Sequence, residues 1–183
     1  MTMVYIILAI VVVLLLIYIS LYNSLVRLRN RSEEAEAQIG AHEKQRYDLI
    51  PNLVETVKGY AAHEKGTLEA VVAARNKAIS STGISESDAS NKELSNALGK
   101  LFALAEAYPQ LKANENFMNL QQTLSAVEEK ILNARKYYNA VVREFNTRCE
   151  TFPSNLAASM GHFSKKPYLE IEEAAKQNVK VSF

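Results

Sequence analysis

Two His-Glu pairs are the residues that come closest to a catalytic motif. The zinc-protease pattern H-E-x-x-H places two histidines one helical turn apart, so that both bind the metal while the glutamate acts as base. The pairs here are His42-Glu43 and His63-Glu64, and the fifth position holds Arg46 in the first and Thr67 in the second. The second metal ligand is therefore missing from both. His162 also has no potential ligand near it in the sequence. We predict no metalloprotease centre.

The other reactive side chains favour structural roles. The single cysteine, Cys149, excludes an internal disulfide and a multi-cysteine metal site, and we interpret it as a half-buried structural residue. Four carboxylates lie close together in the sequence: Asp48, Glu55, Glu64 and Glu69. They lack the paired Glu-x-x-His pattern of di-iron bundles, and the chain carries no glycine-rich phosphate loop. We predict no catalytic residue, no cofactor and no bound metal.

The composition favours one folded domain. The chain has 183 residues, 48% of them apolar, with 21 basic and 20 acidic side chains and a net charge of +1. This length is enough to bury a hydrophobic core, and the balanced charge argues against a nucleic-acid partner. Six glycines and four prolines argue against collagen-like and low-complexity sequence.

The first apolar segment has the length of a membrane anchor. From Val4 to Leu21 only Ser20 is not apolar, and a helix of this length is about 27 Å long, close to the thickness of a bilayer's hydrocarbon core. Tyr5 lies at one end, and Tyr18 and Tyr22 at the other, as expected of rings at headgroup level. A cleaved signal peptide would need basic residues before the segment and small residues at a cleavage site, and neither is present. We predict a retained transmembrane helix.

The flanking charges predict its orientation. Arg27, Arg29 and Arg31 follow the segment, and no basic side chain precedes it. The positive-inside rule then places residues 1–3 outside the cell and the remainder in the cytoplasm. The arginines form a collar around the helix, because residues two apart point in different directions. We expect the collar and the two tyrosines at residues 18 and 22 to lie at the membrane interface. Extra attraction of the collar to anionic lipid is an alternative to a purely topological role.

The rest of the chain has helical periodicity. Nine apolar residues repeat at spacings of three and four, which predicts one helix of more than 30 residues: Phe117, Leu120, Leu124, Val127, Ile131, Ala134, Tyr138, Val141 and Phe145. The same spacing runs from Leu94 to Tyr108, with Ser90 and Glu93 as a capping box. Residues 21–49 and 50–79 carry apolar stripes as well. We predict a kink at Pro51, a break near residues 62–66, a polar loop at 80–90 and a turn at 112–116.

Helices with such stripes and short connections pack together, because none can bury its stripe alone. We predict an all-α protein: a transmembrane helix at residues 4–21, an antiparallel bundle of about four long helices at 22–152, and an extension at 153–183. An extended coiled-coil dimer is the alternative. In the extension, Val179, Val181 and Phe183 alternate with polar residues. They predict either a strand that adds to a partner or a disordered terminus.

Several blocks of the chain resemble one known family. Residues 47–61 read YDLIPNLVETVKGYA, with His63-Glu64 and Ala74-Arg75 after them, and closely resemble the signature of the LemA family of bacterial membrane proteins. Further matches are Tyr22–Val26, Arg29-Asn30, Tyr108–Asn114, Asn116-Phe117, Leu120-Gln121, Tyr138-Asn139, Asn146, Phe152-Pro153 and Gly161. Many members carry Trp and Asp where this chain has Glu36 and Gly40, so we expect that stretch to pack differently.

The resemblance implies a short external N-terminus, one helix in the bacterial inner membrane, a cytoplasmic helical bundle and no established enzymatic activity. One branch of the family is associated with magnetosome membrane formation, which implies a theme of membrane organisation. Within the signature, Asp48, Asn52 and Glu55 share a helix face. We interpret them either as a polar interface for a second copy or a partner, or as local caps and ion pairs around Pro51.

Three functional hypotheses remain. The first is a non-enzymatic, membrane-anchored scaffold that self-associates at the cytoplasmic face and contributes to membrane or envelope organisation. The second is an adaptor that presents its bundle or its C-terminal tail to another envelope protein. The third is an uncharacterised enzyme or metal-binding protein, which the residues support least. The expected partners are the lipid bilayer and further copies of the chain, with no nucleic acid.

Overall fold

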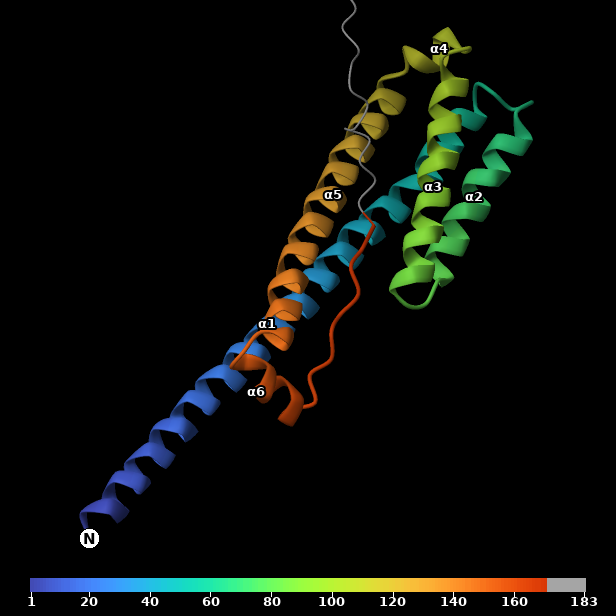
Figure 1. Ribbon diagram of the computed structural model, residues 1–183. Coiled ribbons are helices and arrows are strands. Elements are labelled where there is room, and N and C mark those ends of the chain that lie inside the picture. Colours follow the sequence, from blue (N-terminus) through green and yellow to red (C-terminus); the bar gives the residue numbers. More distant parts are fainter. Residues whose placement is uncertain (171–183) are drawn as a thin grey trace, which may run out of the picture. The chain divides into compact units, whose positions relative to one another are not determined.

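The computed structural model describes residues 1–170, and this part of the chain contains helices but no strand. Figure 1 shows the helices α1 (Thr2–Lys58), α2 (Lys65–Ser80), α3 (Ile84–Ala105), α4 (Pro109–Lys112), α5 (Glu115–Glu150) and α6 (Ser154–Met160). The predicted all-α class is confirmed. The chain divides into two compact units. The first unit comprises residues 1–38 and 136–168, and the second comprises 39–135 together with residues 169–170.

Helix α1 continues through Pro51, where the sequence predicted a kink, and ends at Lys58. A proline has no N–H, so inside a helix it leaves the carbonyl four residues earlier without its usual donor. That carbonyl belongs to Tyr47, and the Nε of Arg75 on α2 donates to it at 2.8 Å. An arginine from the neighbouring helix therefore takes the place of the missing backbone donor. The chain reverses in residues 59–64, which overlap the predicted break.

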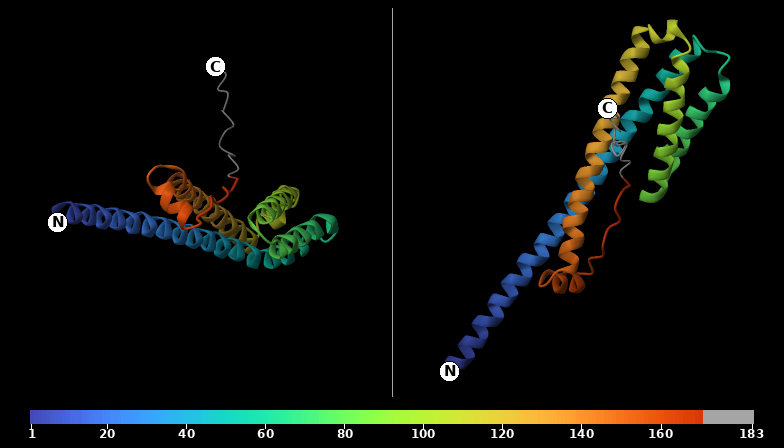
Figure 2. Two further views of the ribbon diagram at one scale, coloured as in Figure 1. Left: turned by 60° about the horizontal axis from the view of Figure 1, so that its bottom comes forward. Right: turned by 45° about the horizontal axis from the view of Figure 1, so that its top comes forward.

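The second unit has a core to which α1, α2, α3 and α5 all contribute. Helices α2 and α3 lie side by side (Figures 1 and 2), joined by the short connection at residues 81–83. The most completely buried apolar residues of this core are Ile50, Leu53, Val57, Val71, Leu94, Leu101 and Leu111. Most of them belong to the predicted stripes. At the start of α5, the Asn114 side chain accepts a hydrogen bond from the Phe117 N–H at 3.0 Å and caps the helix.

The predicted loop at residues 80–90 is confined to residues 81–83, and the capping box predicted at Ser90 is wrong. Helix α3 begins at Ile84, directly after Gly83, whose positive φ of 84° suits glycine. Ser90 and Asn91 lie within the helix and are buried. The small polar composition of this segment resembles a loop, but the buried Asn91 has hydrogen-bond partners on α1, described below. Hydrogen bonds to another helix therefore stabilise the helical conformation of a segment whose own residues favour helix only weakly.

The core of the first unit is smaller. It consists of Leu25 and Leu28 of α1, Phe145 of α5, and Ala157 and Ala158 of α6. Partly buried side chains surround it: Tyr18, Leu21, Cys149 and Phe163. The nine-residue stripe predicted for α5 is buried except for Leu120, which is half-buried.

An extended segment, residues 161–168, follows α6 and packs on the first unit; we refer to it as the strap. The side-chain amide of Asn146 donates to the Lys166 carbonyl at 2.9 Å and accepts from the Lys166 N–H at 2.9 Å. The Tyr138 hydroxyl donates to the Pro167 carbonyl at 3.2 Å. Phe163 packs between the rings of Tyr22 and Phe145, at centroid distances of 5.5 Å and 6.2 Å. This part of the predicted C-terminal extension is therefore held to helices α1 and α5.

Because Pro51 leaves the Tyr47 carbonyl without a backbone donor and Arg75 replaces that donor, we predict an energetic coupling between Pro51 and Arg75. Replacing Arg75→Met should lower the free energy of unfolding by about 1–2 kcal/mol, because the buried Tyr47 carbonyl loses a charged donor. In a Pro51→Ala background the backbone N–H gained at position 51 supplies a donor, so the same replacement should cost less than about half as much. Urea unfolding of the detergent-solubilised protein, followed by circular dichroism, measures the double-mutant cycle. Strictly additive effects of the two substitutions would contradict this role of Arg75.

Candidate functional site

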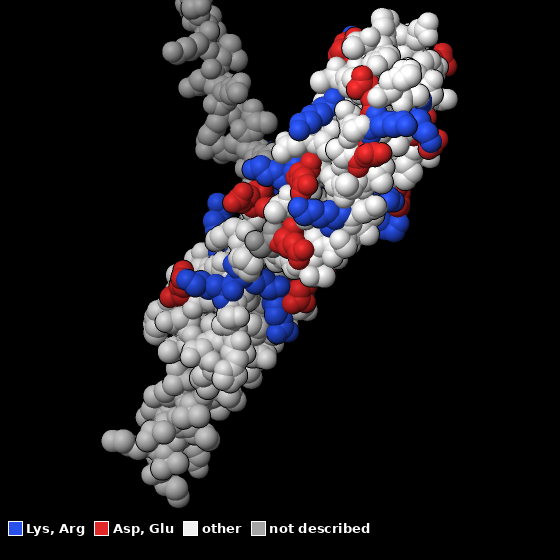
Figure 3. Space-filling model, turned by 90° about the vertical axis from the view of Figure 1, so that its right-hand side faces the viewer, with Lys and Arg blue, Asp and Glu red and all other residues white. Residues whose placement is uncertain are grey.

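The N-terminal part of α1 presents apolar side chains on all sides. From Met3 to Ile17 its large apolar residues are between 46% and 75% exposed, and none packs in a core. In the described residues α1 is the one helix long and apolar enough to cross a membrane. Figure 3 shows this end of the molecule without charged side chains in that view. Such a surface is suited to lipid rather than to water.

The residues predicted at the membrane interface lie directly after this apolar surface. Arg27, Arg29 and Arg31 are exposed, as the collar requires. Arg29 approaches Glu33 at 3.9 Å, and its guanidinium lies 5.5 Å from the centre of the Phe163 ring in the strap. The rings of Tyr18 and Tyr22 are 6.2 Å apart. The structure thus adds a packing role for Tyr22 and Arg29 that sequence reasoning did not predict.

The predicted polar interface on α1 is exposed, and its polar contacts lie within α1. Asp48 pairs with Lys44 at 2.6 Å, and Glu55 with Lys58 at 3.5 Å. The Asn52 carbonyl accepts a hydrogen bond from the side chain four residues later in the helix. These three residues remain a predicted interface. The other predicted interface, formed by Val179, Val181 and Phe183, lies outside the described residues.

A buried ion-pair network, which sequence reasoning missed, crosses the core of the second unit. Arg46 is only 2% exposed, and its Nη1 lies 2.7 Å from a carboxylate oxygen of Glu128 on α5. The same nitrogen donates to the Ser95 hydroxyl at 3.2 Å, and Nη2 donates to the side-chain oxygen of Asn91. The Tyr47 hydroxyl also donates to that oxygen, at 2.7 Å. Both terminal nitrogens of the buried guanidinium therefore have acceptors from α3 and α5, whereas its Nε has none among residues 1–170.

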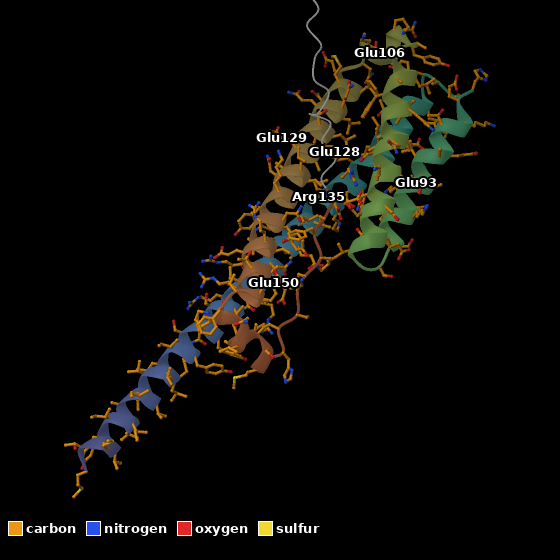
Figure 4. All side chains as sticks on the ribbon, viewed as in Figure 1. Glu93, Glu106, Glu128, Glu129, Arg135 and Glu150 are labelled. Carbon is orange, nitrogen blue, oxygen red and sulfur yellow. The ribbon has the colours of Figure 1, made fainter. Side chains whose placement is uncertain are left out.

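Arg135 forms the second half of this network. Its Nη1 lies 2.6 Å from Asp88 on α3, and its Nη2 lies 3.3 Å from Glu43 on α1. The other oxygen of Asp88 accepts the backbone N–H of Glu170 at 3.3 Å. Figure 4 labels Glu128 and Arg135, seven residues apart along α5. We define the network as Glu43, Arg46, Asp88, Asn91, Glu128 and Arg135.

The stripe on α1 contained a signal for this network. The buried positions of α1 continue from Ile39 through Glu43 and Arg46 to Ile50 at spacings of four, three and four. Polar residues at stripe positions indicate buried polar contacts, because the neighbouring positions on that face are apolar. The sequence does not identify their partners, which lie 45 to 92 residues away along the chain.

The histidines and the cysteine occupy ordinary environments. His63 and His162 are exposed, and His42 is half-buried. Burial raises the pKa of the Cys149 thiol, with a further contribution from Glu150 and an opposing one from Lys165. A raised pKa keeps the thiol protonated and unreactive, which agrees with the structural role predicted for it. Among residues 1–170, no group of three or more potential ligands from His, Cys, Asp and Glu could hold a metal ion.

The network predicts a pH dependence that Glu43 controls. Burial raises the pKa of Glu43, against the opposing effect of Arg135 and then of Arg46 and Asn91. A raised pKa means that the contribution of Glu43 to stability is complete below the unfolded-state pKa and is lost as pH rises through the folded-state value. The Glu43→Gln variant does not lose stability in this way, because a glutamine side chain does not ionise. The free energy of unfolding of Glu43→Gln minus that of the wild type should therefore increase from about pH 4 to pH 8.

Denaturant unfolding across this pH range measures that difference. The matched control is Glu129→Gln, which changes an exposed carboxylate on α5. Its difference from the wild type should stay flat. A flat difference for Glu43→Gln as well would show that burial of Glu43 does not affect its titration.

Comparison with known proteins identifies the family. The sequence profile of the LemA family matches residues 35–183. A relative named Protein LemA, from Metamycoplasma hominis, is 26% identical over 144 residues, covering 78% of this chain and 65% of the relative. Magnetosome protein MamQ 2 of Paramagnetospirillum magneticum is 29% identical over 79 residues, which is 43% of this chain and 29% of that protein. The chain thus spans less than two thirds of the length of these relatives. Because the profile covers most of the chain, this protein belongs to the LemA family.

Proposed function

We propose that this protein is a non-enzymatic, membrane-anchored helical scaffold. In this proposal residues 4–21 of α1 span the membrane and the helical remainder lies at the cytoplasmic face, where copies of the chain associate and contribute to membrane or envelope organisation. The observation that carries the proposal is the exposed apolar surface at the N-terminal end of α1. The same helix continues without interruption into a part that packs against other helices. Leu25 and Leu28, one and two turns beyond the apolar segment, are already buried against α5 and α6.

The arrangement of polar groups supports a structural rather than a catalytic role. Catalytic side chains must face a site that substrate can reach. Here Arg46 and Arg135, both largely buried, have their charges opposed by carboxylates of the same unit. The relatives are consistent with a membrane theme, since three of them are named magnetosome proteins.

Self-association is supported by an exposed apolar pair on α2 and by the effect of anchoring. Val72 and Ile79 are 39% and 51% exposed, and residues seven apart lie on the same face of a helix. Two anchored copies meet at a high effective concentration, so a small contact of this kind is sufficient. We infer that this pair contributes to contacts between copies.

The orientation follows from the positive collar and is open to direct measurement. Protease added outside intact spheroplasts should leave the part of the chain after residue 22 undigested, because that part lies in the cytoplasm. The same protease should digest it once the membrane is permeabilised, which serves as the control. Digestion in intact spheroplasts would overturn the proposed orientation.

The proposed association predicts an effect of the α2 pair. The wild-type protein in lipid nanodiscs or mild detergent should give oligomers by native mass spectrometry. Val72→Gln combined with Ile79→Gln should weaken them about tenfold, equivalent to about 1.4 kcal/mol of lost apolar burial. The matched control, Ala70→Gln with Ala73→Gln, changes exposed residues elsewhere on α2 and should associate normally. A strict monomer for the wild type would overturn self-association, and equal effects of the two pairs would remove the role of Val72 and Ile79.

A further inference from the structure

Helix α6 has its small residues on the protein side and its large apolar residues on the exposed side, the opposite of what is usual for a helix at a water-facing surface. Its small residues, Ala157 and Ala158, face the core of the first unit. Its large apolar residues point away from that core: Leu156 is 57% exposed and Met160 is 68% exposed. Phe152, directly before the helix, is 79% exposed. A helix in contact with water normally has its large apolar side chains on the protein side.

The position of α6 coincides with the end of the apolar surface of α1. Ala157 and Ala158 pack with Leu25 and Leu28 of α1, and Tyr18 and Leu21 contact the same cluster. At the C-terminal end of α6, a Cβ on Gly161 would lie 2.9 Å from the ring of Tyr22. Helix α6 therefore lies beside the segment of α1 in which the apolar run ends and the collar begins.

The distribution of charge matches this position. No Asp, Glu, Lys or Arg occurs from residue 151 to residue 164, although both flanking segments are rich in them. The charged residues resume in the strap, where Lys165 pairs with Glu150 at 2.6 Å and Lys166 with Glu33 at 3.5 Å. An uncharged, outwardly apolar segment thus adjoins the uncharged anchor.

We propose that α6 and Phe152 form a second membrane contact, in which Phe152, Leu156 and Met160 lie in the boundary between headgroups and acyl chains. The partner is the lipid surface of the leaflet in which the apolar run of α1 ends. This inference rests on the proposed membrane span of α1. A short helix with its apolar face in this boundary is a stable arrangement, because its polar backbone stays hydrogen-bonded while its side chains leave water.

The contacts of the first unit favour lipid over a second copy of the chain as the partner. Helix α6 packs beside Tyr18 and Leu21, at the end of the apolar run of α1 that is proposed to lie in lipid. The strap holds the far end of α6 in place, since Phe163 packs on Tyr22 and Asn146 binds both backbone groups of Lys166. The arginine collar beside it suits anionic headgroups.

The test measures the depth of single residues in a bilayer. The full-length protein carries Cys149→Ser and one new cysteine, either Leu156→Cys or Met160→Cys, labelled with a fluorophore. The protein is placed in vesicles of phosphatidylcholine and phosphatidylglycerol. Nitroxide lipids labelled near the carbonyl end of the acyl chain quench probes at the boundary, and iodide quenches probes in water. Two further positions serve as references: Ile17→Cys within the apolar run of α1, and Glu144→Cys on an exposed position of α5.

The expected result is that probes at 156 and 160 are quenched by lipid at least about twofold more than the probe at 144, and less by iodide. Adding Leu156→Asp to the protein labelled at residue 160 should reduce the lipid quenching of that probe, and circular dichroism should show an unchanged helix content because the Leu156 side chain faces outward.

Probes at 156 and 160 that behave like the probe at 144 would overturn the inference while leaving the anchor in place, provided that the probe at 17 is quenched by lipid. Probes at 156 and 160 shielded from both quenchers would show a protein partner instead of lipid. Absence of lipid quenching at 17 would overturn the anchor and the inference together.

Discussion

The first unit depends on a change in the sequence pattern along α1. The helix begins with apolar residues on all of its faces and continues with apolar residues on one face only. Up to Ile17 the helix has no polar face, and its large apolar side chains are exposed; Tyr18 and Leu21 are the first to pack, partly buried, against the core of the first unit. From Leu25 onward the apolar residues form a stripe, and α5, α6 and the strap pack against it. Packing needs a stripe, because only a one-sided helix can bury its apolar groups while its polar groups remain in water. The collar, α6 and the strap all meet at this place.

The second unit depends on the ion-pair network. An arginine buried without acceptors would cost several kcal/mol. Arg46 has acceptors on α3 and α5, and Arg135 joins α5 to α1 and α3. These contacts hold for one register of the three helices, since a shift of α1 by one turn would put Glu43 or Ile50 at the position of Arg46. Apolar packing alone discriminates less sharply between such registers, so the network supplies specificity to a core that is otherwise aliphatic.

The link between Pro51 and Arg75 shows the same principle on the backbone. The proline removes one hydrogen bond from α1, and a side chain of α2 provides the replacement. The helix therefore continues to Lys58, and the residues around the proline remain part of the core, with Ile50 and Leu53 fully buried. The helix continues through a residue that usually breaks helices, because a donor from another element bonds the Tyr47 carbonyl that the proline leaves without its backbone partner.

The helical class, the long apolar segment of α1, most of the buried stripes and the arginines that follow the apolar segment could be predicted from the sequence, because each of these depends on residues a few positions apart. Four features depend on tertiary contacts instead: the helical start of α3, the passage of α1 through Pro51, the buried network and the outward direction of Leu156 and Met160. Each of these depends on a partner far away in sequence. Asn91 is separated from Arg46 by 45 positions, and Glu43 from Arg135 by 92. Periodicity shows that a face is buried, but it does not show which atoms of another helix complete it.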